Sequence, residues 1–205
     1  MAQLDIPDHK PVLIYTSYRT GSTALCDTIA SQLNRKNFDE AYHPTLFPER
    51  HREYMHYKKT NTDFVLKIMP DQITEANKDD IGTMFEQCYR IRLVRQDIVA
   101  QIASWYVSMV TDFWHQTEHK QMAVDTVPIN EEFMLSCCHR ILWNNDQVAS
   151  FPAEAFDANI TYENIPGGIH SQYRPRNRSN NYEEILQLVE QTLIDNELAE
   201  KKHAG

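Results

Sequence analysis

The stretch PVLIYTSYRTGSTAL, residues 11–25, joins a short apolar run to a polar turn and the start of a helical pattern. The run Val12–Tyr15 is typical of a buried strand, and apolar residues recur at helical spacing from Thr23 onward. A strand, a tight turn and a helix start bring backbone N–H groups and the positive end of a helix dipole to one point, which favours an anion. The sequence therefore predicts a phosphate-binding turn over Thr16–Ser22.

The side chains of this turn suit an anion but do not form a standard nucleotide-triphosphate loop. Gly21 lets the backbone approach a ligand closely, Ser22 and Thr23 add hydroxyl donors, and Arg19 adds a planar cation that can form paired hydrogen bonds. The pattern G-x-x-x-x-G-K-[ST] is not met, because the first glycine is absent and Ser22 stands in the place of the lysine. An ordinary strand–helix turn with a Ser or Thr cap is the alternative.

The string YRTGST, residues 18–23, resembles the 5′-phosphosulfate loop of sulfotransferases, in which a basic residue precedes [ST]-G-[ST]-T. The wider string SYRTGSTALCDTIA, residues 17–30, is most similar to the trehalose 2-sulfotransferase family, which has the pattern S-x-R-[ST]-G-S-T-x-L-C-D. The resemblance implies that the donor is 3′-phosphoadenosine 5′-phosphosulfate (PAPS), and that Arg19 also meets the charge of the transferring group. The implied donor-binding residues of this loop are Arg19, Thr20, Gly21, Ser22 and Thr23.

A second motif follows the predicted strand Tyr89–Val94, where Asp97 is a suitable N-cap for an apolar helix. The trehalose 2-sulfotransferase family has R-x-D-x-x-x-Q-A-x-S here, and Arg95, Asp97, Gln101 and Ser104 match at that spacing. The residue after Gln101 is Ile where the family has Ala. The resemblance implies that Arg95 and Ser104 bind the 3′-phosphate of the donor.

Two later stretches resemble sulfotransferases more weakly. Residues 160–165, ITYENI, fit a V-x-Y-E-[DN]-[LI] pattern, in which we interpret Glu163 as a structural hydrogen-bonding residue. Residues 172–185 hold the densest positive cluster of the chain, and an exposed basic loop is the alternative interpretation. By resemblance, the residues of this loop that cover the 3′-phosphate and the adenine are Arg176, Arg178 and Ser179.

The candidate general base is Glu40, in the predicted loop 37–50. The resembling family places a catalytic glutamate here in a G-E-[YP]-F string, and Asp39 stands in the place of its glycine. A carboxylate can remove the proton of a sugar hydroxyl as the oxygen attacks sulfur. The alternatives are an exposed loop acid at position 40, and His43 as the base because its ordinary pKa suits proton transfer.

The second clear strand, Asp63–Met69, ends in Lys67-Ile68-Met69-Pro70. Cytosolic animal sulfotransferases have K-[ST]-H-L-P at the comparable place, and that histidine is their base. The histidine is missing here, which favours Glu40. Lys67 could either reach the donor or extend its charged end to solvent.

Composition bounds the class of protein. A chain of 205 residues predicts one domain over 1–205, and the formal charge of −9 argues against a general nucleic-acid binder. The sequence shows neither a membrane-length apolar run nor a signal pattern, so we expect a cytoplasmic protein without a membrane partner. The four cysteines lack metal spacing and are expected to be buried and reduced, and no metal is expected.

Alternating strands and helices predict an α/β fold: three αβα layers with a central, mostly parallel sheet, and with both donor motifs at its carboxyl edge. The resemblance implies a P-loop-like sulfotransferase fold, and it makes a homodimer plausible. We therefore expect a PAPS-dependent sulfotransferase acting on a hydroxyl of a carbohydrate or small metabolite. A phosphate-loop nucleotide kinase and a non-catalytic nucleotide- or sugar-binding module stay open as alternatives.

Overall fold

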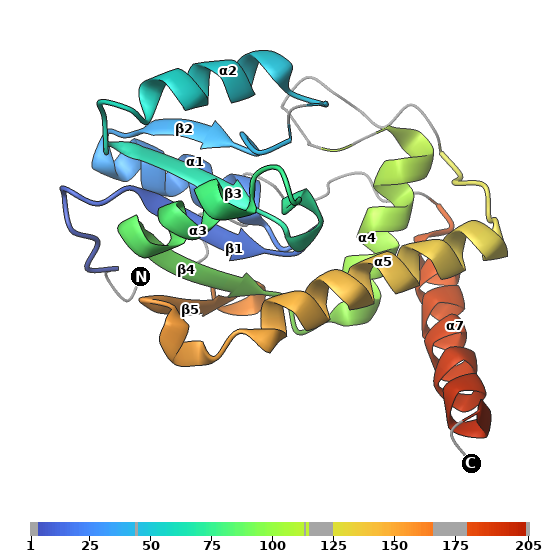
Figure 1. Cartoon of the computed structure of the whole chain (residues 1–205). Helices are drawn as coiled ribbons and strands as arrows, with labels where there is room; N and C mark the ends of the chain where they lie inside the picture. The colour runs from blue at the N-terminus through green and yellow to red at the C-terminus, as the bar shows by residue number, and fades with distance from the viewer. Residues whose placement is uncertain (1–3, 44, 113, 115–124, 166–179, 204–205) are drawn as a thin grey trace. The chain divides into compact units, whose positions relative to one another are not determined.

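The computed structural model describes residues 4–43, 45–112, 114, 125–165 and 180–203 (Figure 1). Their contacts divide the chain into two compact units. The first unit takes in the described parts of Met1–Gln96 and Asn144–Ile169, and the second those of Asp97–Trp143 and His170–Gly205. The single domain expected from the sequence stays a prediction.

The first unit is built on a five-stranded sheet in which every neighbouring pair of strands is parallel. This arrangement confirms the predicted α/β fold, and Figure 1 shows helices alternating with its strands. Because parallel strands all point the same way, their carboxyl ends meet at one edge of the sheet. In spatial order the strands are β2 (Lys36–Asp39), β3 (Phe64–Ile68), β1 (Val12–Thr16), β4 (Tyr89–Val94) and β5 (Ala158–Thr161).

One face of the sheet is covered by α1 (Ser22–Leu33), which contacts β1, β2 and β3. Ile14 pairs in register with Lys67, and Lys67 bonds to Thr23 at the start of α1. Successive strand residues point to opposite faces, so Ile14 and its even-numbered neighbours in β1 lie on the α1 face. This face therefore carries the buried, charged side chain of Lys67.

The opposite face holds a large apolar cluster that includes Leu13 and Tyr15 of β1. It is covered by α2 (Pro48–Tyr57) and α3 (Lys78–Gln87), whose Tyr54 and Met84 belong to the same cluster. Several edge-to-face aromatic pairs order this layer, among them Phe38–Tyr54 with ring centroids 5.4 Å apart. The first unit therefore has the three layers expected from the sequence.

The second unit contains α4 (Ile98–Thr111), most of α5 (Glu131–Ser150) and α7 (Tyr182–His203). Within it α4 packs against α7. The Asp97 carboxylate caps α4 as predicted, accepting from the Ala100 N–H at 2.9 Å. The buried Tyr106 hydroxyl donates to the Pro128 carbonyl and accepts from the Asn130 N–H, each at 2.8 Å, which orders the start of α5.

One local expectation was wrong. Residues 37–39 were expected to belong to the loop 37–50 but form, together with Lys36, the edge strand β2, in which only Phe38 is fully buried. With one fully buried side chain among four residues, this strand shows no alternation of apolar and polar residues in the sequence. Its pairing with β3 is long-range, so the local pattern does not indicate it either. The helix α3 begins at Lys78, after the 3-10 turn η1 (Pro70–Gln72).

The predicted burial of the cysteines is confirmed. Cys26, Cys88, Cys137 and Cys138 are all buried and none forms a disulfide. Within the described ranges, no helix has the length and apolar character needed to cross a membrane.

We predict that Leu13→Ala lowers the free energy of unfolding of the chain by about 2–5 kcal/mol, because it leaves a cavity beneath fully buried neighbours. The matched control is Leu46→Ala, whose side chain is 63% exposed and whose loss should change stability by less than about 0.5 kcal/mol. Urea unfolding of the two variants beside the wild type measures both effects. Equal losses in the two variants would contradict the assignment of β1 to the centre of the core.

Candidate functional site

The predicted turn links the carboxyl end of β1 to the start of α1. Gly21 is the N-cap of α1 with φ 77°, and Arg19 also has a left-handed backbone with φ 56°. Helix geometry leaves the N–H groups of the first turn without acceptors inside the helix, and Gly21 has no side chain to cap them. The turn therefore presents the donor groups and the helix dipole that an anionic group requires.

The buried hydroxyls of Thr16 and Thr20 connect the turn to the end of the neighbouring strand β4. The Thr16 hydroxyl lies 2.6 Å from the Thr20 hydroxyl and donates to the Leu93 carbonyl at the end of β4, at 2.8 Å. Both threonine side chains are fully buried. Thr20 is a predicted donor-binding residue, but its hydroxyl is engaged inside the fold, so the part of Thr20 that suits a ligand is its backbone.

Gly21 is required by space as well as by conformation. A Cβ atom at this position would lie 2.8 Å from ring carbons of Tyr162, in the turn η3 (Tyr162–Asn164), and 3.8 Å from Ile165. The ITYENI stretch therefore packs directly on the phosphate-binding turn. Glu163 of the same stretch accepts a hydrogen bond from the Gln96 N–H at 3.0 Å, which agrees with the structural role expected for it.

The structure brings Arg95 to the same turn. Its Nη1 donates to the Arg19 carbonyl at 3.1 Å, and its guanidinium carbon lies 4.6 Å from the centroid of the Tyr162 ring, within cation–π range. The Nε atom of Arg95 is buried and has no hydrogen-bond partner among the described residues. A buried N–H that lacks an acceptor is costly, so this atom is suited to a ligand oxygen.

Lys67 lies at the end of β3, on the α1 face of the sheet. Its ammonium donates to the Thr23 hydroxyl at 2.5 Å and forms ion pairs with Asp39 Oδ1 at 2.8 Å and Glu40 Oε1 at 3.1 Å. Only 3% of the side chain is exposed, so the charged end does not extend to solvent. Burial opposes the charged form, but the carboxylates of Asp39 and Glu40 outweigh it and raise the pKa of Lys67, so the ammonium stays protonated.

Glu40 lies just beyond the end of β2, beside the start of α1. Its Oε2 accepts from Gln72 Nε2 at 3.1 Å, so each carboxylate oxygen has one partner, and 18% of the side chain is exposed. Asp39 has φ 46°, a left-handed conformation that glycine adopts most easily. Asp39 therefore has a backbone conformation that favours glycine, which is the residue that the resembling family has at this place.

His43, the rival base, lies in a different environment. Its Nδ1 accepts weakly from the Leu46 N–H at 3.4 Å, and its ring packs edge-on against Phe47. Among the interactions of the described residues, Glu40 contacts the charged cluster at the loop, whereas the contacts of His43 are local.

The turn η1 supports the site through residues that the sequence did not indicate. The Tyr18 hydroxyl donates to the Asp71 carboxylate, which ties the phosphate-binding turn to η1. Gln72 is 5% exposed and holds Glu40. Pro70 marked the end of a strand, but nothing in the local pattern showed that the next two residues contact segments far away in the sequence.

The remaining predicted residues lie elsewhere. Ser104 is on α4 in the second unit, and its role as a phosphate ligand stays a prediction. The basic-loop residues Arg176, Arg178 and Ser179 lie outside the described residues.

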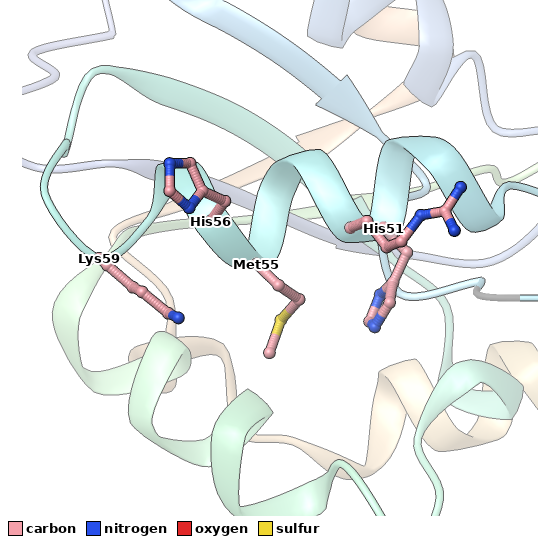
Figure 2. Close-up of a pocket in the computed structure, with 5 residues that line it drawn as sticks. His51, Met55, His56 and Lys59 are labelled. Carbon is pink, nitrogen blue, oxygen red and sulfur yellow. The ribbon is translucent and has the colours of Figure 1, made fainter.

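A surface hollow is lined mainly by residues of α2, none of them a predicted site residue, and Figure 2 shows its side chains. Its lining contains no residue of the turn. Within the described part of the chain, no group of three or more His, Cys, Asp or Glu side chains is placed to hold a metal ion. The residues that line the hollow are His51, Arg52, Met55, His56 and Lys59.

Two solved structures of retinol dehydratase are similar to this chain. The first, in complex with androsterone and the inactive cofactor PAP, has a TM-score of 0.40 and 13% sequence identity, over 92% of this chain and 65% of the other. The second, in a complex with retinol and PAP, has a TM-score of 0.36 and 12% identity, over 91% and 66%. This chain thus spans just under two thirds of the length of those proteins. No protein-family model and no curated protein matches it.

We predict that Gly21→Ala destabilises the chain by about 1–3 kcal/mol, because it combines a positive φ with a clash against the Tyr162 ring. The matched control is Gly82→Ala in α3, where an added Cβ meets nothing within 4 Å. That change should stabilise the chain by about 0.5–1 kcal/mol, the helix-propensity difference. Thermal unfolding of both variants measures the contrast, and a stabilised Gly21→Ala variant would show that the turn has a different conformation.

Proposed function

We propose that this chain is a PAPS-dependent sulfotransferase that transfers a sulfuryl group to an acceptor hydroxyl. The observation that supports this most is the hydrogen bond from Arg95 Nη1 to the Arg19 carbonyl. It joins two motifs that are 76 residues apart in sequence, and that the sulfotransferase resemblance assigns to two ends of one donor.

The donor end of the site consists of fixed positive groups. The N–H groups at the start of α1 and the guanidinium of Arg19 suit the 5′-phosphosulfate, and the buried Nε of Arg95 suits an oxygen of the 3′-phosphate. These groups lie in a chain with a formal charge of −9, so the attraction for an anion is local rather than general. Ser104 and the basic loop with Arg176, Arg178 and Ser179 complete this proposed set.

The acceptor end of the site is assigned to Glu40. Its carboxylate takes the hydroxyl proton while the acceptor oxygen forms a bond to sulfur. The bond from sulfur to the phosphate oxygen breaks, and the bisphosphate product keeps the electron pair. Arg19 and the backbone donors of the turn stabilise the charge on the transferring group, and such donors typically contribute about 3–4 kcal/mol each to lowering the barrier.

Finer assignments belong to the same proposal. The left-handed backbone of Asp39 supports the alignment of Glu40 with the glutamate of the trehalose 2-sulfotransferase family. A carbohydrate or other small polar metabolite is therefore the proposed acceptor. We also propose a cytoplasmic location and a homodimer, and size-exclusion chromatography with light scattering tests the second of these.

We predict that the chain binds 3′,5′-adenosine bisphosphate, the desulfated donor, with a micromolar dissociation constant, and that Arg95→Ala weakens this binding by at least about tenfold through loss of a charged hydrogen-bond donor. Isothermal calorimetry measures both values. The matched control is Arg52→Ala, on the α2 surface and outside the proposed donor site. Binding of ATP–Mg²⁺ without binding of the bisphosphate would favour the nucleotide kinase instead.

We predict that Glu40→Gln lowers turnover by about 100-fold or more while the affinity for the bisphosphate is retained, because the amide cannot accept the hydroxyl proton. Sulfuryl transfer from labelled PAPS to a panel of carbohydrate and small hydroxyl acceptors measures it. His43→Gln is the comparison variant and should retain turnover. The reverse result would assign the base to His43, and donor binding without transfer to any acceptor would favour the non-catalytic module.

A further inference from the structure

The ammonium of Lys67 connects three separate segments of the chain. An ammonium has three N–H donors, and three acceptor groups lie within reach: the Thr23 hydroxyl in α1, the Asp39 carboxylate at the end of β2, and the Glu40 carboxylate beyond it. All three distances fall between 2.5 and 3.1 Å. The ammonium therefore donates a hydrogen bond to Thr23, and its charge is compensated by two ion pairs within the chain itself.

The charges around this ammonium balance. Asp39 also pairs with Arg50 of α2, whose Nη1 lies 3.2 Å from Asp39 Oδ2, so two cations face two carboxylates. The neighbouring Cys26 on α1 is fully buried, and burial raises the pKa of its thiol well above the ordinary value, so it adds no charge. Removing one member would leave an uncompensated charge in a site with little access to water.

We propose that Lys67 is a positioning residue that holds Glu40 against the phosphate-binding turn, with Asp39 as the counter-charge that keeps Lys67 in place. This inference rests on the proposed function. Lys67 fixes one carboxylate oxygen of Glu40 and Gln72 fixes the other, so the carboxylate has one orientation relative to Thr23 before an acceptor arrives. Asp39 stands in the place of a glycine of the resembling family, and a glycine could not supply this counter-charge.

A double-mutant cycle separates this role from direct contact with the donor. Lys67→Met is expected to lower kcat at least about tenfold, with the bisphosphate dissociation constant changed by less than about twofold. In the Glu40→Gln background the same change should have no further effect on kcat, because Lys67 acts through Glu40. The matched control is Lys36→Met, another sheet lysine paired with a glutamate, Glu53, and outside the site.

Two results would overturn the proposal. The first is a loss of bisphosphate affinity of similar size with Lys67→Met in both backgrounds, which would make Lys67 a donor ligand. The second is wild-type turnover in Lys67→Met. If Lys67→Met does not fold, Asp39→Asn provides the same cycle, because it removes the counter-charge and keeps the shape of the side chain.

A second measurement does not depend on activity. The ¹⁵N-labelled ammonium of Lys67, assigned by its disappearance in Lys67→Arg, should give a proton signal protected from exchange with water, and Asp39→Asn and Glu40→Gln should each shift it. A rapidly exchanging signal that neither variant shifts would overturn the positioning role. If the signal behaves as expected but the wild type neither binds the bisphosphate nor transfers a sulfuryl group, then the proposed function fails while the cluster stands.

Discussion

The parallel pairing of β1 with β3 on one side and β4 on the other is the constraint on which the site depends. It places the ends of three strands side by side, so the turn after β1, Lys67 at the end of β3 and Arg95 after β4 meet at one edge. None of these residues is near another in sequence. The hydrogen bond from the Thr16 hydroxyl to the Leu93 carbonyl links β1 to β4 at the point where β1 ends and the turn begins.

Arg95, which was predicted to bind the donor, and Lys67, for which donor contact was one of two possibilities, are held by different means. Arg95 is held by a backbone carbonyl and by an aromatic ring, neither of which neutralises its charge. Lys67 is held by the carboxylates of Asp39 and Glu40, which neutralise its charge. An incoming anion would therefore be attracted to the side of the turn where Arg95 lies, whereas the Lys67 side is already compensated. Under the proposed function, this asymmetry would place donor binding and proton transfer on different sides of one turn.

The sequence predicted the elements whose signal is local. Val12–Tyr15 is a continuous apolar run, Asp97 precedes a helix as its cap, and the glycine of the turn permits the left-handed backbone found there. It did not predict β2, because an edge strand is defined by its partner and Lys36–Asp39 buries only Phe38 completely.

At the site, too, the sequence did not predict the contacts that join residues far apart in the chain. The roles of Gln72 and Tyr162 come from contacts across 32 and about 140 residues of sequence, respectively, which periodicity does not report. Lys67 is the clearest case. A lysine in a strand suggested either solvent or ligand, and the structure gives a third outcome, because its partners Asp39 and Glu40 follow a strand that the sequence did not indicate.

Asp39 shows how a departure from a family pattern can carry information. A left-handed backbone at a non-glycine residue typically costs about 1–2 kcal/mol, and glycine would avoid that cost. The chain has an aspartate there, with one oxygen on Lys67 and the other on Arg50. Without this carboxylate the Lys67 ammonium, with 3% of its side chain exposed, would face Glu40 as its only counter-charge among the described ion pairs. The strain at position 39 is therefore best explained as the cost of keeping a charged lysine inside the sheet.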